Sequence, residues 1–256
     1  MVEILSPRVV VAAGATESPP LLRRSGLGRH PQLGRNLAVH PAVSVAGFFD
    51  ERVDATSGVL QSAGIDHFHE SDGILVEATS APPGMGSMVL PGAGRQLVRH
   101  LERSDHLVTL GAMIGDAPAG RVHGSRHSVV RYDLQPVDAG RLVKSIGIMG
   151  RILFAAGATE VLTGVRGHEQ VRTVAELDEA ATNARPSRLH VAAFHPTGTA
   201  RMGADSQTHP VDETGRLRGA EGVWVADASI VPSCPEVNPQ LTIMALALAV
   251  AERMQR

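Results

Sequence analysis

The feature of this sequence that most constrains its fold is an apolar segment near the C-terminal end, residues 241–254. Ala, Leu and Met, all good helix formers, dominate this segment, and it contains neither Gly nor Pro. Asn238 is a favoured helix N-cap, and Pro239 suits the first helical position, where a missing N–H costs nothing. Because apolar residues occur on nearly every side of the segment, we predict a buried helix. The apolar run 241–251 is too short to span a bilayer.

The start of such a helix is itself a binding feature. It presents free backbone N–H groups at the positive end of the helix dipole, and an electronegative group is favoured there. The alternative is that Asn238 only caps an ordinary core helix, because this capping pattern is common.

His195 is the most informative titratable residue. It follows the apolar run 189–194, which predicts a buried strand, and it precedes the turn-forming sequence Pro-Thr-Gly-Thr. Catalytic side chains are often placed where a rigid strand meets a loop. Imidazole titrates near neutrality, so it can accept a hydroxyl proton. A histidine at a strand end is also often structural, and the surrounding motifs have to decide between the two interpretations.

The N-terminal segment has a strand, a glycine and a helix in succession. Residues 9–13 form a β-branched run that predicts a buried parallel strand ending at Gly14. Ser18 and Pro19 then mark a helix start, and Ser25-Gly26 marks its end. This order is a Rossmann-like step, in which a small residue lets a cofactor approach the backbone. Any other strand-to-helix turn gives the same pattern.

Three C-terminal segments and two N-terminal segments carry a specific resemblance. The C-terminal ones read HPTGTARMG from residue 195, VADASIVP from residue 225 and NPQLTIMALA from residue 238. In this order they resemble the C-terminal signature of the glucose–methanol–choline (GMC) oxidoreductases. The segment from Gly14 to Gly28, and the segment from Gly34 to Pro41 that follows it, are similar to a second signature of the same family.

The resemblance implies a cofactor, a reaction and a set of site residues. Members of that family bind FAD and oxidise alcohols by hydride transfer to the flavin. The resemblance implies that His195 is the general base and that Asn238 is its partner at the reactive edge of the flavin. The implied cofactor-binding residues are Gly14 and Ala15 in the first turn, Asp227 and Ala228 near the FAD phosphates and ribityl chain, and Pro239, Gln240 and Thr242 near the flavin ring.

One expected element is missing from the sequence. A dinucleotide fold opens with a strand followed by Gly-x-Gly-x-x-Gly, and the chain has no such opening. In the GMC family the ADP-binding βαβ unit lies upstream of the Gly14 motif, and only residues 1–13 precede it here. We therefore interpret the chain as the C-terminal portion of such a protein and expect a complementary ADP-binding chain as a partner. Apolar surface left bare beside residues 9–13 then favours aggregation or association.

Three functions are compatible with this interpretation. The first is an FAD-dependent alcohol oxidase or dehydrogenase acting on a small-molecule alcohol. The second is a catalytically incompetent remnant or a subunit completed by a partner, which the missing opening supports. The third is a non-redox, flavin-bound lyase, because the family includes members that hold FAD without redox turnover.

The middle of the chain has a different pattern. The strand-like segments are 43–49, 73–79, 107–114 and 128–134, and the predicted helices are 95–103, 139–156 and 174–183. Asp138 is expected to cap the second helix and Gly157 to end it. Strands with few intervening helices predict an antiparallel sheet with helices on one face. The predicted fold class is α/β (α+β overall): a partial FAD-binding Rossmann-like domain in 1–41 and 189–256, and a substrate-binding domain in 42–188.

Composition excludes several classes of function. A chain of 256 residues with 43% apolar and 20% charged residues is globular. Its net charge of −2 and its 3% aromatic content argue against a nucleic-acid partner. A single cysteine cannot form an intrachain disulfide, and the first residues lack the features of a signal peptide, so we predict a cytoplasmic protein.

The remaining chemically active side chains are given structural interpretations. His67 and His69 resemble metal ligands, but no second Cys or His pair follows at zinc-like spacing, so no metal is predicted. His40 and His209 precede prolines and are interpreted as turn residues. Cys234 is interpreted as a small buried hydrophobe, because no paired base can be placed beside it.

Overall fold

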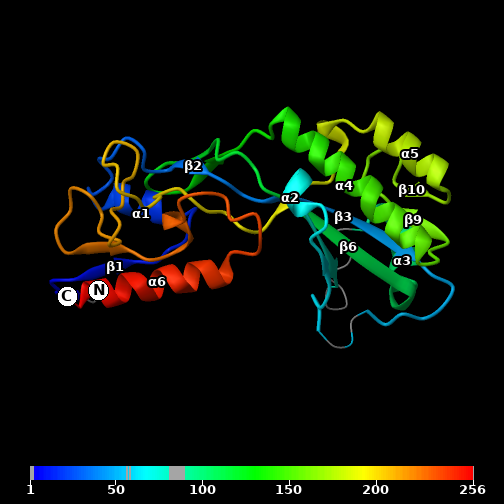
Figure 1. Cartoon of the computed structure of the whole chain (residues 1–256), viewed down its shortest axis with the longest axis horizontal. Coiled ribbons are helices and arrows are strands. Elements are labelled where there is room, and N and C mark those ends of the chain that lie inside the picture. The colour runs from blue at the N-terminus through cyan, green and yellow to red at the C-terminus, as the bar shows by residue number, and fades with distance from the viewer. Residues whose placement is uncertain (1–2, 56, 58, 81–89, 256) are drawn as a thin grey trace. The chain divides into compact units, whose positions relative to one another are not determined.

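The computed structural model describes residues 3–55, 57, 59–80 and 90–255 (Figure 1). The chain divides into two compact units. The first comprises residues 1–40, 116–133 and 193–256, and the second comprises residues 41–115 and 134–192. The segment 116–133, which the sequence analysis places in the substrate-binding domain, belongs to the first unit. Its strands are too short to mark a change of unit in the sequence.

The first unit contains a parallel strand pair. β1 (Val9–Val11) pairs with β12 (Val223–Val225), and α1 (Ser18–Arg24) follows β1, as predicted. The prediction of a buried strand is wrong, because Val9 and Val10 are 49% and 45% exposed. In the described part of the chain β1 has a strand on one side only.

The apolar core of this unit joins segments far apart in sequence. Its buried members are Val11, Leu22, Leu33, Ala200, Val211, Leu217, Val223, Trp224, Val225, Ile230 and Val250. β1, α1, β12 and the C-terminal helix therefore all contribute to one core.

A second, antiparallel sheet in this unit has the order β2-β7-β8. These strands are Arg35–Leu37, Gly120–His123 and Val129–Arg131. β8 lies inside the predicted strand 128–134 but is shorter. Gly34, just before β2, has φ of +82°, and a Cβ there would clash with the carbonyl oxygen of Val122. Glycine is therefore required at this close approach of two backbones.

The C-terminal helix α6 (Gln240–Met254) confirms the predicted helix and corrects two details. Pro239, not Asn238, occupies the N-cap position, because its φ of −86° and ψ of 1° start the helix one residue later than predicted. The helix is also not buried: of its residues only Val250 is fully buried, while Leu241, Met244 and Leu248 are 79%, 52% and 67% exposed. Only one side of α6 packs against the core of its unit.

The second unit is built on a larger antiparallel sheet. Its strands, in spatial order, are β10 (Gln170–Val171), β9 (Glu160–Leu162), β3 (Pro41–Phe48), β6 (Leu107–Ile114), β5 (Ile74–Thr79) and β4 (Gly64–Ile65), and the short β11 (Ala192–Ala193) also pairs with β3. The predicted strands 43–49, 73–79 and 107–114 are confirmed. The predicted buried strand 189–194 is wrong, because only β11 forms there and Phe194 is 71% exposed.

Two of the predicted helices, those at 139–156 and 174–183, cover one face of this sheet. α4 (Pro136–Ala155) packs against β3 and β6, and α5 (Val174–Asn183) packs against α4 (Figure 1). Their core includes the fully buried Val45, Ile146 and Leu177.

The second unit also contains the shorter helices α3 and α2. Leu97 and Leu101 of α3 (Arg95–Glu102) pack against Ala46 and Phe48 of β3. Neighbouring residues of a strand point to opposite faces, so Ala46 and Phe48 lie on the face of the sheet opposite α4. Helical cover is therefore not confined to one face of the sheet. α2 (His69–Asp72) is a single turn.

The ends of α4 only partly match the prediction. Gln135 is the N-cap and Pro136 lies in the first turn, so Asp138 is not the cap and instead lies 3.5 Å from Arg141. Gly157, with φ of +100°, ends the helix as predicted. Within the ranges that the structure describes, no helix combines the length and apolarity needed to cross a bilayer.

Candidate functional site

Asp227 joins the two ends of the first unit. One of its carboxylate oxygens accepts hydrogen bonds from the backbone N–H of Gly14 at 2.9 Å and from Oγ of Ser18 at 2.5 Å. The other oxygen accepts from the N–H of Ser229 at 2.7 Å. This buried carboxylate therefore fixes the turn between β1 and α1 to the segment after β12.

The turn held by Asp227 is open on its outer side. Gly14 has φ of +83°, and a Cβ added to it would meet nothing within 4 Å. Beside it, the carbonyl of Ala15 accepts a hydrogen bond from Oγ1 of Thr199 at 2.6 Å. An open glycine backbone between a parallel strand and a helix leaves room for a ligand to approach closely.

The segment after His195 is tied to two other motifs. Thr197 and Ala38 exchange backbone hydrogen bonds at 2.9 and 3.2 Å. The N–H of Gly198 donates to the carbonyl of Ala228 at 3.2 Å. At Gly198, where φ is +84°, a Cβ would lie 2.6 Å from the carbonyl oxygen of Asn36, so only glycine fits. The two residues 197 and 198, which follow His195 closely, are thus hydrogen-bonded to Ala38 and to the predicted site residue Ala228.

His40 lies beside His195 and was missed as a site residue by the sequence analysis. The two ring centroids are 5.6 Å apart with an interplanar angle of 78°, an edge-to-face arrangement. His40 is only 1% exposed, and its Nε2 accepts a hydrogen bond from the backbone N–H of Glu236 at 2.9 Å. Glu236 precedes Asn238 by two residues, so His40 connects the segment of the predicted partner to the ring of the predicted base.

Asp116 fixes the backbone of His40. Its buried carboxylate accepts hydrogen bonds from the N–H groups of Val39 and His40, both at 3.1 Å, and from the hydroxyl of Tyr132 at 2.9 Å. The Sγ of Cys234 donates to the same carboxylate at 3.5 Å. His40 has φ of +51°, and these bonds hold it in that left-handed conformation.

The electrostatics of this network keep His40 neutral. Burial lowers the pKa of His40, and the neighbouring His195 lowers it further, although Asp116 and Glu236 act in the opposite direction. Because Nε2 accepts a hydrogen bond, the proton of the neutral ring lies on Nδ1. In the described part of the chain that buried Nδ1 has no hydrogen-bond partner.

Cys234 is not set up as a nucleophile. Burial raises the pKa of its thiol to about 12, and the charge of Asp116 adds to the increase. The thiolate, which is the reactive form, is therefore scarce at neutral pH. This agrees with the structural interpretation of Cys234.

The remaining predicted site residues lie at the start of α6. Pro239 is buried, whereas Gln240 and Thr242 are exposed in the first turn. Asn238 is also largely exposed, just before them. One residue that the GMC resemblance did not assign, Ser229, has a buried Oγ that lacks a hydrogen-bond partner in the described ranges.

Among the described residues there is no group of three or more His, Cys, Asp or Glu side chains that could hold a metal ion.

Comparison with known proteins decides the family. Residues 118–247 match the C-terminal domain model of the GMC oxidoreductases, and residues 1–42 match the N-terminal domain model. This chain belongs to the GMC oxidoreductase family. This confirms the family that the motifs imply, and GMC oxidoreductases are FAD-dependent.

Individual relatives agree with this assignment. The chain is 61% identical to an uncharacterised GMC-type oxidoreductase of Mycobacterium tuberculosis, over 98% of this chain and 40% of the relative. It is 28% identical to a long-chain-alcohol oxidase of Arabidopsis thaliana, over 94% of this chain and 36% of the relative. The structure is similar to formate oxidase of Aspergillus oryzae, with a TM-score of 0.69 and 17% identity over 97% of this chain and 54% of that one. The chain thus spans less than half the length of the curated relatives named here.

Proposed function

We propose that this chain provides the catalytic C-terminal portion of an FAD-dependent oxidoreductase that acts on the CH–OH group of an alcohol. The observation that carries the proposal is the convergence of the motifs in one unit. Asp227 binds Gly14, and the segment after His195 is hydrogen-bonded to residues near His40 and Ala228. Motifs of one signature that meet in space form a site, whereas a sequence match alone does not.

The residues around the β1–α1 turn fit FAD. Gly14 and Ala15 would offer an open backbone to the cofactor, and Asp227 with Ala228 would lie at its ribityl and phosphate side. Because the Asp227 carboxylate is engaged by three protein donors, we infer that it shapes the turn and that nearby backbone groups meet the cofactor. Pro239, Gln240 and Thr242, at the positive end of the α6 dipole, would lie near the flavin ring. Bound FAD supplies the hydride acceptor.

The chain's own residues supply acid–base chemistry. His195 takes the hydroxyl proton of the alcohol at its imidazole, and Asn238 hydrogen-bonds the same oxygen. His40 beside it is held neutral, so His195 gains its proton without a second fixed positive charge next to it. General-base catalysis of this kind contributes about 10²–10⁴ in rate.

An apolar alcohol is the substrate class we favour. One relative is named a long-chain-alcohol oxidase, and that name supports this class. We infer that the second unit is the substrate-binding domain of the enzyme.

A complementary ADP-binding unit is the partner that the first unit requires. β1 is roughly half exposed, and Leu241, Met244 and Leu248 form an exposed apolar row on one side of α6. We infer that a βαβ unit, upstream in the same polypeptide or on a second chain, covers this surface and completes a Rossmann-like domain. The single cysteine, which cannot form an intrachain disulfide, supports a cytoplasmic location.

Reconstitution tests the proposal. The purified chain is mixed with FAD, alone and together with the recombinant N-terminal portion of the Mycobacterium tuberculosis relative, and bound flavin is measured by its visible spectrum after gel filtration. We expect flavin to co-elute with the mixture of the two chains and to be bleached by an aliphatic alcohol without oxygen. Co-elution of the two chains without flavin would contradict the proposed cofactor site. Bound flavin that no alcohol bleaches would contradict the oxidoreductase function.

A further inference from the structure

Three arginines lie in register across the small sheet of the first unit. In β2 and β7, Arg35 is paired with Arg121, and in β7 and β8, Arg121 is paired with Arg131. Residues directly opposite each other in an antiparallel sheet point to the same face, with Cβ atoms about 5 Å apart. All three side chains are exposed. The sheet therefore presents a continuous row of guanidinium groups.

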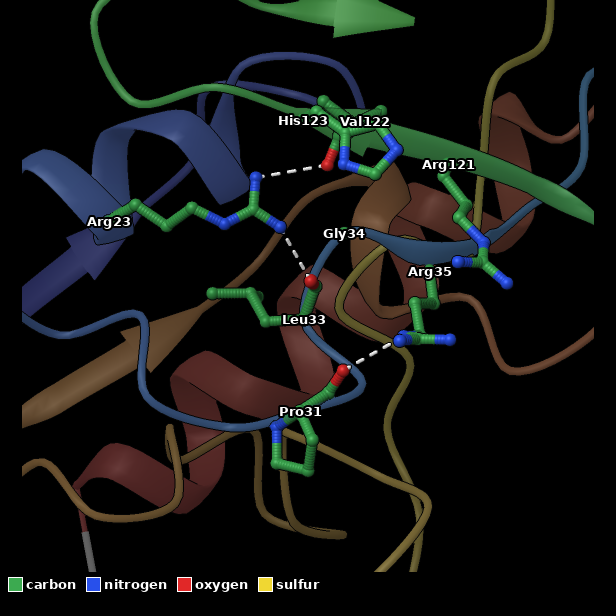
Figure 2. A pocket seen from close by; sticks show the side chains of 8 residues that line it. All are labelled: Arg23, Pro31, Leu33, Gly34, Arg35, Arg121, Val122 and His123. Atoms are coloured by element: carbon green, nitrogen blue, oxygen red, sulfur yellow. Dashed lines mark hydrogen bonds between the residues drawn. The ribbon is translucent and has the colours of Figure 1, made fainter. Parts of the chain in front are cut away.

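A cavity lies at one end of this arginine row. It has a volume of about 170 Å³, and its lining residues are Arg23, Pro31, Leu33, Gly34, Arg35, Arg121, Val122 and His123. Figure 2 shows the side chains of Arg35 and Arg121 extending to the same side of the cavity, with Arg23 approaching from the other side. The lining contains four basic side chains and no acidic one.

The arginines differ in how far they are engaged. Arg23 is structural: it donates hydrogen bonds to the carbonyls of Leu33 at 2.6 Å, Val122 at 2.9 Å and Gly124 at 3.2 Å. Arg35 donates from Nε to Pro31 at 3.0 Å, a bond that does not use its two terminal amino groups. For Arg121 and Arg131 the structure gives neither an ion pair nor a side-chain hydrogen bond within the described ranges.

Fold stability does not account for this row. Like charges directly opposite on neighbouring strands are destabilising. The chain as a whole carries a net charge of −2, so the row is a local concentration of positive charge. A bound anion would relieve the repulsion between the three guanidinium groups, which suggests that the row binds an anion.

We propose that the Arg35–Arg121–Arg131 row is a binding site for the phosphoryl group of a small phosphate ester. Guanidinium groups match phosphate oxygens in a two-pronged geometry, and adjacent arginines can share one phosphate. His123, two residues after Arg121 on the same strand face, adds a further donor. The backbone N–H of Val122 is not available to the anion, because it donates a hydrogen bond to the carbonyl of Gly34. The donors to the anion are therefore side chains.

The size of the cavity limits what it can hold. Small-molecule sites generally occupy about 300–1,000 Å³, and this cavity is smaller. A phosphoryl group fits, and the remainder of an ester would lie outside along the exposed sheet. Inorganic phosphate would occupy the same positions, so the experiment has to separate the two sources.

The test is a titration of the full chain, labelled with ¹⁵N, followed by NMR. Sodium phosphate, sodium pyrophosphate and AMP are each added at constant ionic strength, with uncharged adenosine as the reference. We expect saturable shifts of the amide signals of Gly34 and His123, and binding that weakens as salt rises. Tighter binding of AMP than of phosphate identifies an ester as the ligand, whereas equal affinity identifies free phosphate.

A matched pair of variants makes the test specific. Arg121→Gln removes the central charge and should raise Kd at least tenfold, whereas Arg166→Gln, an exposed arginine of the second unit, should leave Kd unchanged. Because Arg121 makes none of the described side-chain bonds, the variant should fold, and circular dichroism checks this. The proposal is overturned if none of the anions shifts Gly34 and His123, or if both variants bind equally well.

Discussion

The backbone N–H of Glu236 donates a hydrogen bond to Nε2 of His40 at 2.9 Å. Through this bond, the segment that leads into α6 is anchored on a buried ring that lies edge-on to His195. His40 is in turn held by Asp116, which accepts from its backbone N–H. A residue that the sequence offers only as a turn former thus connects the two ends of the proposed catalytic site.

His40 should make stability depend on pH in a defined direction. Its pKa in the folded state is lowered, so the neutral form is favoured by folding. The corresponding stability is complete above the unfolded-state pKa of about 6.5 and is lost as pH falls below that value toward the folded-state pKa. We expect the free energy of unfolding of the wild type to fall between about pH 8 and about pH 5 more steeply than that of His40→Gln, which keeps an acceptor but does not titrate.

Urea unfolding of both proteins across this range measures the difference. His40→Leu, which leaves the N–H of Glu236 without its acceptor, should lower stability at every pH by about 1–3 kcal/mol. Parallel pH curves for the wild type and His40→Gln would refute the assignment of a neutral His40. Asp116, Glu236 and His195 also act on the pKa of this ring, and they remain unchanged in both proteins.

Cys234 should react slowly with alkylating reagents. With its pKa raised to about 12, its thiolate fraction near pH 8 is on the order of a thousandfold smaller than that of an ordinary cysteine. Mass spectrometry of the native chain treated with iodoacetamide, with the urea-unfolded chain as the control, measures the ratio. Equal rates in the two states would show that the thiol is neither buried nor bonded to Asp116.

Asp227→Asn should loosen the β1–α1 turn. The carboxylate accepts from Gly14, Ser18 and Ser229, and an amide of the same shape keeps only one acceptor oxygen. We expect a loss of about 2–3 kcal/mol in the free energy of unfolding, against about 1 kcal/mol for Ser18→Ala, which removes a single donor. Chemical denaturation of the two variants gives these values. A loss no larger for Asp227→Asn than for Ser18→Ala would mean that Asp227 does not clamp the turn.

Leu248→Lys should reduce self-association without unfolding the chain. Leu248 is 67% exposed on α6, so a charge there removes apolar surface at little cost to the core. Val250 is 1% exposed in the same helix, and Val250→Lys should instead unfold the first unit. Light scattering and circular dichroism separate the two effects. An unchanged degree of association for Leu248→Lys would remove the support for a covering partner on this face.

Local sequence patterns predicted the positions of helices and strands better than they predicted which residues are buried. The residues of α5 and β6 are those expected, because a helix or strand pattern of that length is decided by its own residues. The prediction that α6 and β1 are buried was wrong. An apolar sequence shows that burial would be favourable, but it does not show that another segment packs over it. The predicted strand before His195 was wrong for a related reason. Leu189 packs against the core of the second unit, but Val191 is 37% exposed and only residues 192–193 form a strand.

The contacts of His40 with Asp116 were beyond prediction from sequence. The two residues lie 76 positions apart and neither stands in a pattern that names the other. The only signal was the position of His40 within the second GMC-like motif. By contrast, His195, Asp227 and Asn238 were found because a family signature names them directly, and their catalytic and binding roles stay predictions.

The proposed function depends above all on His195 as the base of an alcohol-oxidising flavin site. The most direct measurement is the rate of flavin bleaching by an aliphatic alcohol without oxygen, in the flavin-loaded complex of this chain with its complementary N-terminal portion. His195→Ala should bind flavin normally and slow bleaching by at least about 100-fold, the lower range of general-base catalysis. Bleaching at a near-normal rate in a flavin-loaded His195→Ala complex would contradict the account.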